Sequence, residues 1–205
     1  MKSIFTIVTV LVLAGLALIV PAESNANLII NGGFDNGYSS WTPANNDGAG
    51  GWRGTGGNPG GRFILNAAGQ TTLDPTIAQT ITGLQTGQTY SVTWDQFYEY
   101  QNTPGPIGFG VYLDSQPGNP ISLNGYTGTG WKTFSTTFVA SAPVVTLIFA
   151  AELDGRTPGV SGSTDMGYAI DNVKMEASSV PLPSALLFFG PGLAGLAAIR
   201  RRFKK

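Results

Sequence analysis

Two residue types are missing from this 205-residue chain, and their absence limits its chemistry. The sequence contains no histidine and no cysteine. Nucleophilic catalysis by Ser-His-Asp or Cys-His groups is therefore excluded, as are zinc sites built on histidine. A folded domain without disulfides must be held by its apolar core, with a metal ion as the other available support.

Paired carboxylates are the remaining catalytic signal, because glycoside hydrolysis uses two acidic side chains. The candidate pairs are Asp95 with Glu99, and Glu152 with Asp154. Acidic side chains on the outward side of an acidic domain are usually solvated. We therefore predict that the protein is not an enzyme.

Aromatic and acidic side chains at outward positions indicate a binding surface instead. Aromatic rings stack on the flat C–H faces of sugars, and acids or amides hydrogen-bond to sugar hydroxyls. The candidate ligand-binding residues are Phe97, Glu99, Tyr112, Asp114 and Trp52. Trp52 lies in a Gly- and Asn-rich stretch over residues 43–61, for which a solvated loop is the simpler interpretation. We assign Trp41, Trp94 and Trp131 to the core.

The elements that position these residues are short runs rich in Thr, Val, Ile, Tyr and Phe, separated by Gly, Pro and Asn clusters. This spacing predicts an all-β jelly-roll β-sandwich. We expect strands at residues 27–31, 62–66, 77–82, 89–98, 107–113, 133–140, 144–150 and 168–176. Alternation points Tyr90, Val92 and Trp94 inward and Asp95 outward.

Four segments in order resemble the galactose-binding-like jelly rolls of carbohydrate-binding modules. They are the opening Asn27-Leu28-Ile29-Ile30-Asn31-Gly32-Gly33-Phe34-Asp35 with Trp41 after it, the run from Ile77 through Gly87 to Tyr90, the strand start Gly130-Trp131-Lys132-Thr133-Phe134, and the closing Ala169-Ile170-Asp171-Asn172-Val173. The resemblance implies a structural calcium ion with Asp35 and Asp171 as ligands and a carbonyl near Gly33 completing its oxygen shell. The alternative is that Asp35 caps a turn and Asp171 pairs with neighbouring donors.

The N-terminal segment has the order of a secretory signal peptide. Lys2 is followed by an apolar run over residues 4–20 and by the small-x-small sequence Ser24-Asn25-Ala26. We therefore predict a signal peptide at residues 1–26, a jelly-roll domain at 27–179, and a separate C-terminal segment at 180–205.

The C-terminal segment combines a proline motif, an apolar run and a basic end. The motif is Val180-Pro181-Leu182-Pro183, and Arg200, Arg201 and Arg202 begin the basic end. This order resembles the PEP-CTERM sorting signal of bacterial exoproteins, although Leu182 stands where that motif has Glu. The resemblance implies an apolar transmembrane sorting helix, an exosortase-type processing enzyme as partner and the inner membrane as a transient location. An ordinary tail anchor is the alternative.

Residues 27–179 carry 5 basic and 11 acidic residues, a net charge of −6. A domain with this negative charge lacks the excess of basic residues that binds a phosphate backbone, so we expect no nucleic-acid partner. The sequence thus predicts a bacterial protein that is exported to the cell surface or extracellular matrix and binds extracellular polysaccharide. A structural matrix or surface-coat protein without sugar binding remains the alternative, and a small glycan-active enzyme is a third class.

Overall fold

The computed structural model describes residues 26–46, 50–66, 73–101, 107–116, 118–153 and 166–178, and its regular elements there are all β-strands. The signal peptide and C-terminal segment predicted above lie outside these residues. The strands are β1 (Thr42–Ala44), β2 (Gly51–Arg53), β3 (Arg62–Asn66), β4 (Thr76–Thr82), β5 (Thr89–Gln101), β6 (Ile107–Leu113), β7 (Ser122–Asn124), β8 (Lys132–Val139), β9 (Val144–Leu153) and β10 (Met166–Ala177). The described residues contain no helix long and apolar enough to span a bilayer.

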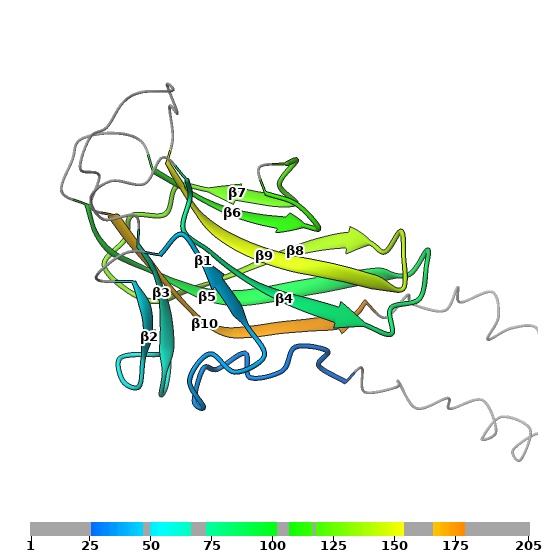
Figure 1. Cartoon of the computed structure of the whole chain (residues 1–205), viewed down its shortest axis with the longest axis horizontal. Coiled ribbons are helices and arrows are strands. Elements are labelled where there is room, and N and C mark those ends of the chain that lie inside the picture. Colours follow the sequence, from blue (N-terminus) through cyan, green and yellow to red (C-terminus); the bar gives the residue numbers. More distant parts are fainter. Residues whose placement is uncertain are drawn as a thin grey trace, which may run out of the picture. The chain divides into compact units, whose positions relative to one another are not determined.

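The strands form two five-stranded antiparallel sheets, which confirms the predicted β-sandwich (Figure 1). The first sheet has the order β1-β4-β9-β6-β7, and the second has the order β2-β3-β10-β5-β8. The two longest strands, β5 and β10, pair at the middle of the second sheet. The C-terminal end of the domain lies in this sheet because β10 is the last strand, and the N-terminal end lies beside it because Leu28 N–H bonds to β10.

One apolar core fills the space between the sheets, because alternate residues of each strand point inward. Trp94 of β5 is fully buried, and its ring stacks on those of Phe109 and Phe134. Tyr90 and Val92 share its face of β5 and are buried too, as the alternation predicts.

The opening segment differs from the sequence prediction, which makes residues 27–31 a strand. Leu28 N–H donates to the Met175 carbonyl, so the segment does begin alongside β10. The Ile30 backbone is then hydrogen-bonded to the Gln79 side chain, whose Oε1 accepts from the Ile30 N–H and whose Nε2 donates to the Ile30 carbonyl. Asn31 follows at φ 53°, a left-handed conformation outside the β region, and the segment turns there.

The Gly-rich stretch over residues 43–61 also differs from the solvated loop predicted above. It contains β2 and the last two residues of β1, and residues 54–61 join β2 to β3. We call residues 54–61 the glycine loop. Its Asn58–Pro59 peptide bond is cis, and Gly57 N–H donates to the Gly60 carbonyl.

Candidate functional site

Two aspartates lie side by side on the outer face of the second sheet. Asp171 of β10 is directly opposite Asp95 of β5 in the strand register. Asp171 has 0 % of its surface exposed and Asp95 has 6 %. The outward direction predicted for Asp95 is therefore correct, but the expectation that it is solvated is wrong because the glycine loop bonds to both carboxylates.

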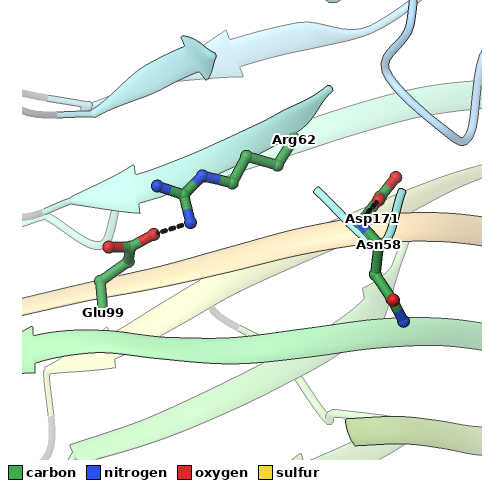
Figure 2. Close-up of polar contacts among 4 residues, drawn as sticks. All are labelled: Asn58, Arg62, Glu99 and Asp171. Atoms are coloured by element: carbon green, nitrogen blue, oxygen red, sulfur yellow. Dashed lines mark hydrogen bonds and ion pairs between the residues drawn. The ribbon is translucent and has the colours of Figure 1, made fainter. Parts of the chain in front are cut away.

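The glycine loop is attached to the two carboxylates through Asn58. Its backbone N–H donates to Asp171 Oδ2 at 2.5 Å, as Figure 2 shows, and its side-chain Nδ2 donates to Asp95 Oδ2 at 3.0 Å. Asn172 Nδ2 donates both to that oxygen at 2.8 Å and to the Asn58 carbonyl. Thr133 Oγ1 donates to Asp95 Oδ1 at 2.6 Å. Three donors thus hold the Asp95 carboxylate.

Asp35 joins this cluster from the turn after the opening segment. Gly61 N–H points to Asp35 Oδ1 at 3.5 Å. A Cβ placed on Gly33 would lie 3.4 Å from Asp35 Oδ2 and 3.9 Å from Asp171 Oδ1. The fold therefore brings Gly33, Asp35 and Asp171 close together.

Glycines surround these carboxylates where a side chain would not fit. A Cβ on Gly60 would overlap Asp35 Oδ1, and one on Gly57 would lie 2.7 Å from Asp171 Oδ2. Gly60 also has φ 89°, which residues with a Cβ rarely adopt. The loop can approach the acids this closely only because these positions have no side chain.

The pKa of Asp171 is raised from 3.8 to about 6, chiefly by burial and to a smaller extent by the negative charges of Asp95 and Asp35. The N–H groups of Asn58 and Asn172 act in the opposite direction by stabilising the charged carboxylate. At neutral pH the cluster therefore holds a buried negative charge beside two other acids.

The donor atoms of this cluster suit an oxygen-coordinated cation. Asp35 and Asp171 offer carboxylate oxygens of the kind that Ca²⁺ takes, and a cation would offset the repulsion among the acids. Across the described ranges, no group of three or more Asp, Glu, His or Cys side chains is arranged to hold a metal ion. A cation would therefore have at most two acidic side chains as ligands, with amide, backbone or water oxygens supplying the rest.

Glu99 lies on the same outer face, but it is paired. Arg62 Nη1 is 2.5 Å from Glu99 Oε1, and both side chains are mostly buried (Figure 2). A Cβ on Gly56 of the glycine loop would lie 3.2 Å from the Arg62 guanidinium carbon, so the loop rests against this ion pair. The paired-carboxylate hypothesis for Asp95 and Glu99 loses its basis, because both acids are held by other groups.

Phe97 and Trp131 form an aromatic pair beside Glu99. Their ring centroids are 5.5 Å apart with the planes at 44°. Both side chains are half-buried, and Phe97 lies on the outer face because it pairs with the outward Ala169. The sequence prediction assigned Trp131 to the core, and the structure instead places it against Phe97 at the start of β8.

Tyr112 and Asp114 lie on the other sheet and do not join this surface. Tyr112 has the predicted outward direction but is only 4 % exposed, packed with Ile148 and Ala150. Asp114 Oδ1 accepts the Thr146 N–H at 2.8 Å, which ties the end of β6 to β9. The prediction that both face solvent as ligand contacts is therefore wrong for Tyr112 and unsupported for Asp114.

Trp52 lies on a third surface, at the β2 edge of the second sheet. Its side chain is 38 % exposed, and its indole N–H donates to the Phe34 carbonyl at 2.7 Å. The five predicted ligand residues thus fall on three surfaces. Asn58, Asn172 and Trp131 were missed as site residues. The Asp171-Asn172 pair and the turn sequence Gly57-Asn58-Pro59-Gly60 were the available signals.

The predicted processing residues, Val180 to Pro183 and Arg200 to Arg202, lie outside the described residues.

Several solved structures have a similar fold, at identities that carry information on fold alone. TmCBM61 in complex with β-1,4-galactotriose has a TM-score of 0.51 at 16 % identity, over 75 % of this chain and 99 % of that one. The CBM22-1–CBM22-2 tandem of Paenibacillus barcinonensis Xyn10C has a TM-score of 0.57 at 12 % identity, over 79 % of this chain and 52 % of that one. The CBM22-1–GH10 modules of Clostridium thermocellum Xyn10B with xylohexaose have a TM-score of 0.52 at 12 % identity, over 78 % of this chain and 30 % of that one.

No curated protein matches the sequence at a significant level. The carbohydrate binding domain family CBM_4_9, by contrast, matches residues 26–159, which is more than half of the chain and includes the outer face that carries Phe97, Glu99 and Trp131. The chain therefore belongs to the carbohydrate binding domain family, and its β-sandwich is a jelly roll of the carbohydrate-binding-module kind.

Proposed function

We propose that this domain binds extracellular polysaccharide through the outer face of its second sheet, with Phe97 and Trp131 as the sugar-contacting rings. The observation that carries the proposal is this ring pair. It lies half-buried on an outward sheet surface, where an apolar side chain gains further burial only if a partner covers it. Membership of a carbohydrate-binding, non-catalytic family supplies the class of ligand.

The neighbouring charges support this face over the others. The Arg62–Glu99 ion pair lies on the same outer face as Phe97, so this face combines aromatic and polar groups as ligand sites do. The Tyr112 face offers no comparable ring, since Tyr112 is already packed among Ile148 and Ala150. Binding to one sugar ring would be weak, so avidity along a polymer should dominate.

Affinity electrophoresis tests the proposal. The purified protein is run in gels containing β-1,4-galactan, xylan or bacterial exopolysaccharide, the first two chosen because structural neighbours were solved with galactotriose and xylohexaose. At least one polymer should retard the wild type, and Trp131→Ala should lose most of that retardation. Leu123→Ala, which removes an exposed side chain from the other sheet, is the matched control. A wild type that no polymer retards would instead support the structural matrix-protein alternative.

We further propose that the protein is exported and processed at both ends. The support is the signal-peptide order of residues 1–26 and the similarity of residues 180–205 to a PEP-CTERM sorting signal read by an exosortase-type enzyme. Intact-mass measurement of protein recovered from the cell surface should show a start near Asn27 and the loss of Arg200, Arg201 and Arg202. Recovery of the whole C-terminal segment on the stable surface form contradicts the processing.

A structural calcium ion at Asp35 and Asp171 is the third proposal. Its support is the oxygen-only donor set, the close approach of the glycine backbone to both acids, and the excess negative charge there. When bound, the cation would supply positive charge between the opening turn and the last strand. Asp35 and Asp171 would hold it, and the glycine loop would cover it.

A further inference from the structure

Two exposed aromatic side chains lie away from the surface proposed above. Tyr38 is 49 % exposed and Trp52 is 38 % exposed, and they are the two most exposed aromatic side chains among the described residues. Both border Phe63. Trp52 lies opposite Phe63 in the strand register, and the Tyr38 ring meets the Phe63 ring edge-on at 6.1 Å. We call Tyr38 and Trp52 the edge pair.

The Trp52 ring is held in place although it is exposed. Its indole N–H is already bonded to the Phe34 carbonyl, so the ring offers apolar faces to a partner and no free donor. A Cβ on Gly54 would lie 3.1 Å from the far carbon of the ring, and one on Gly61 would lie 3.2 Å from its nitrogen. Glycine backbone therefore lies against the ring at these two points. A ring fixed in this way loses little conformational entropy when a sugar stacks on it.

The edge pair cannot act on the same sugar ring as Phe97 and Trp131. In the second sheet, β2 is separated from β5 by β3 and β10, and three strand spacings amount to about 14 Å. The two surfaces also face opposite ways. Trp52 shares the face of the core residue Phe63, whereas Phe97 shares the outer face with Ala169. The two aromatic surfaces are therefore independent.

We propose that Tyr38 and Trp52 form a second sugar-contacting surface, and that a single domain bridges two polysaccharide chains. The partner is the apolar C–H face of a pyranose ring within a polymer, which a bare ring without free hydrogen-bonding groups matches. This inference rests on the proposed polysaccharide binding and adds a valence of two to it. Two independent sites that face opposite ways allow one domain to hold two chains at once, which cross-links the polymer.

The test uses whichever polymer retards the wild type most in the galactan, xylan and exopolysaccharide gels. Beads coated with that polymer should clump when wild-type protein is added. Trp52→Ala and Trp131→Ala should each lose the clumping yet keep weakened retardation, and the double variant should lose both. Titration calorimetry with a short oligosaccharide of the same polymer should give two molecules bound per protein, and one for each single variant.

Tyr38→Ala guards against a folding defect in Trp52→Ala, because the Tyr38 ring only touches the edge of Phe63 and its loss leaves the Trp52 hydrogen bond intact. It should reduce clumping in the same direction. A stoichiometry of one in the wild type, or complete loss of binding in Trp131→Ala, overturns the second surface while leaving polysaccharide binding in place. A wild-type dimer that Trp52→Ala converts to a monomer also overturns it, because the patch is then a subunit contact. Absence of retardation by every polymer defeats the proposed function itself.

Discussion

Asp171 makes the stability of the metal-free protein depend on pH in a direction that can be derived from its surroundings. Its pKa is raised from 3.8 to about 6 by burial and by the charges of Asp95 and Asp35. The folded state therefore favours the protonated carboxyl. The stability that this gives is complete below pH 4 and is lost as the pH rises through 6. We expect metal-free protein to become less stable between pH 4.5 and pH 8.

The size of the effect follows from the shift in pKa. A rise from 3.8 to about 6 corresponds to about 3 kcal/mol at about 1.4 kcal/mol per pH unit, of which about 2 kcal/mol falls between pH 4.5 and pH 8. Asp171→Asn isolates this contribution, because it removes the titrating group and leaves every other acid in place. The variant leaves one of the two N–H donors, from Asn58 or Asn172, without its acceptor. That loss costs about 1–3 kcal/mol and does not vary with pH.

Urea unfolding in metal-free buffers at several pH values measures the free energy of unfolding of both proteins. The wild-type value minus the Asp171→Asn value should fall by about 2 kcal/mol from pH 4.5 to pH 8. Equal slopes of the two proteins with pH would refute the reasoning, since they would mean that the Asp171 carboxyl titrates alike in the folded and unfolded states.

Three further changes test other contacts. Calcium at a hundredfold excess over its dissociation constant should stabilise the protein by about 2.7 kcal/mol and raise its melting temperature, and Asp35→Ala should abolish the rise; equal melting curves in calcium and in chelator contradict the cation site. Gly57→Ala should cost about 1–3 kcal/mol because the new Cβ overlaps the Gly61 carbonyl, whereas Gly130→Ala has nothing within 4 Å and should change stability by less than about 0.5 kcal/mol. Tyr112→Ala should lower the free energy of unfolding in urea by about 3–5 kcal/mol, because the ring packs against Ile148 and Ala150. Retardation of the folded variant by the polymer should be unchanged. Weaker retardation would show that Tyr112 contacts the polymer.

The strands that form the core are predictable because their side chains alternate. In Thr89–Gln101 the inward Tyr90, Val92 and Trp94 give the pattern, and β3 and β6 have the predicted bounds. The three-residue strands β1, β2 and β7 give no such pattern, since three residues are too few for a period of two to be recognised. Their pairing is decided by the longer neighbours β4, β3 and β6.

Exposure is less predictable than direction, because a sequence shows which face a side chain takes but not what covers that face. Asp95 and Tyr112 both point outward, as predicted, and both are buried. Asp95 is covered by segments far away in sequence, and its contact with Asn58 spans 37 positions. No local pattern around Asp95 carries that information.

The glycine loop shows why the site was harder to predict than the sheets. Eight residues with few side chains touch three functional positions: Gly54 borders Trp52, Gly56 borders Arg62, and Asn58 binds Asp171. What the loop contributes is backbone donors and missing Cβ atoms, and neither gives a periodic signal in the sequence. A Gly-rich composition is typical of flexible linkers, but it also suits a loop whose backbone must lie close to a buried charge. The contacts distinguish the two cases, because a flexible linker would leave Asp171 and Asp95 in water.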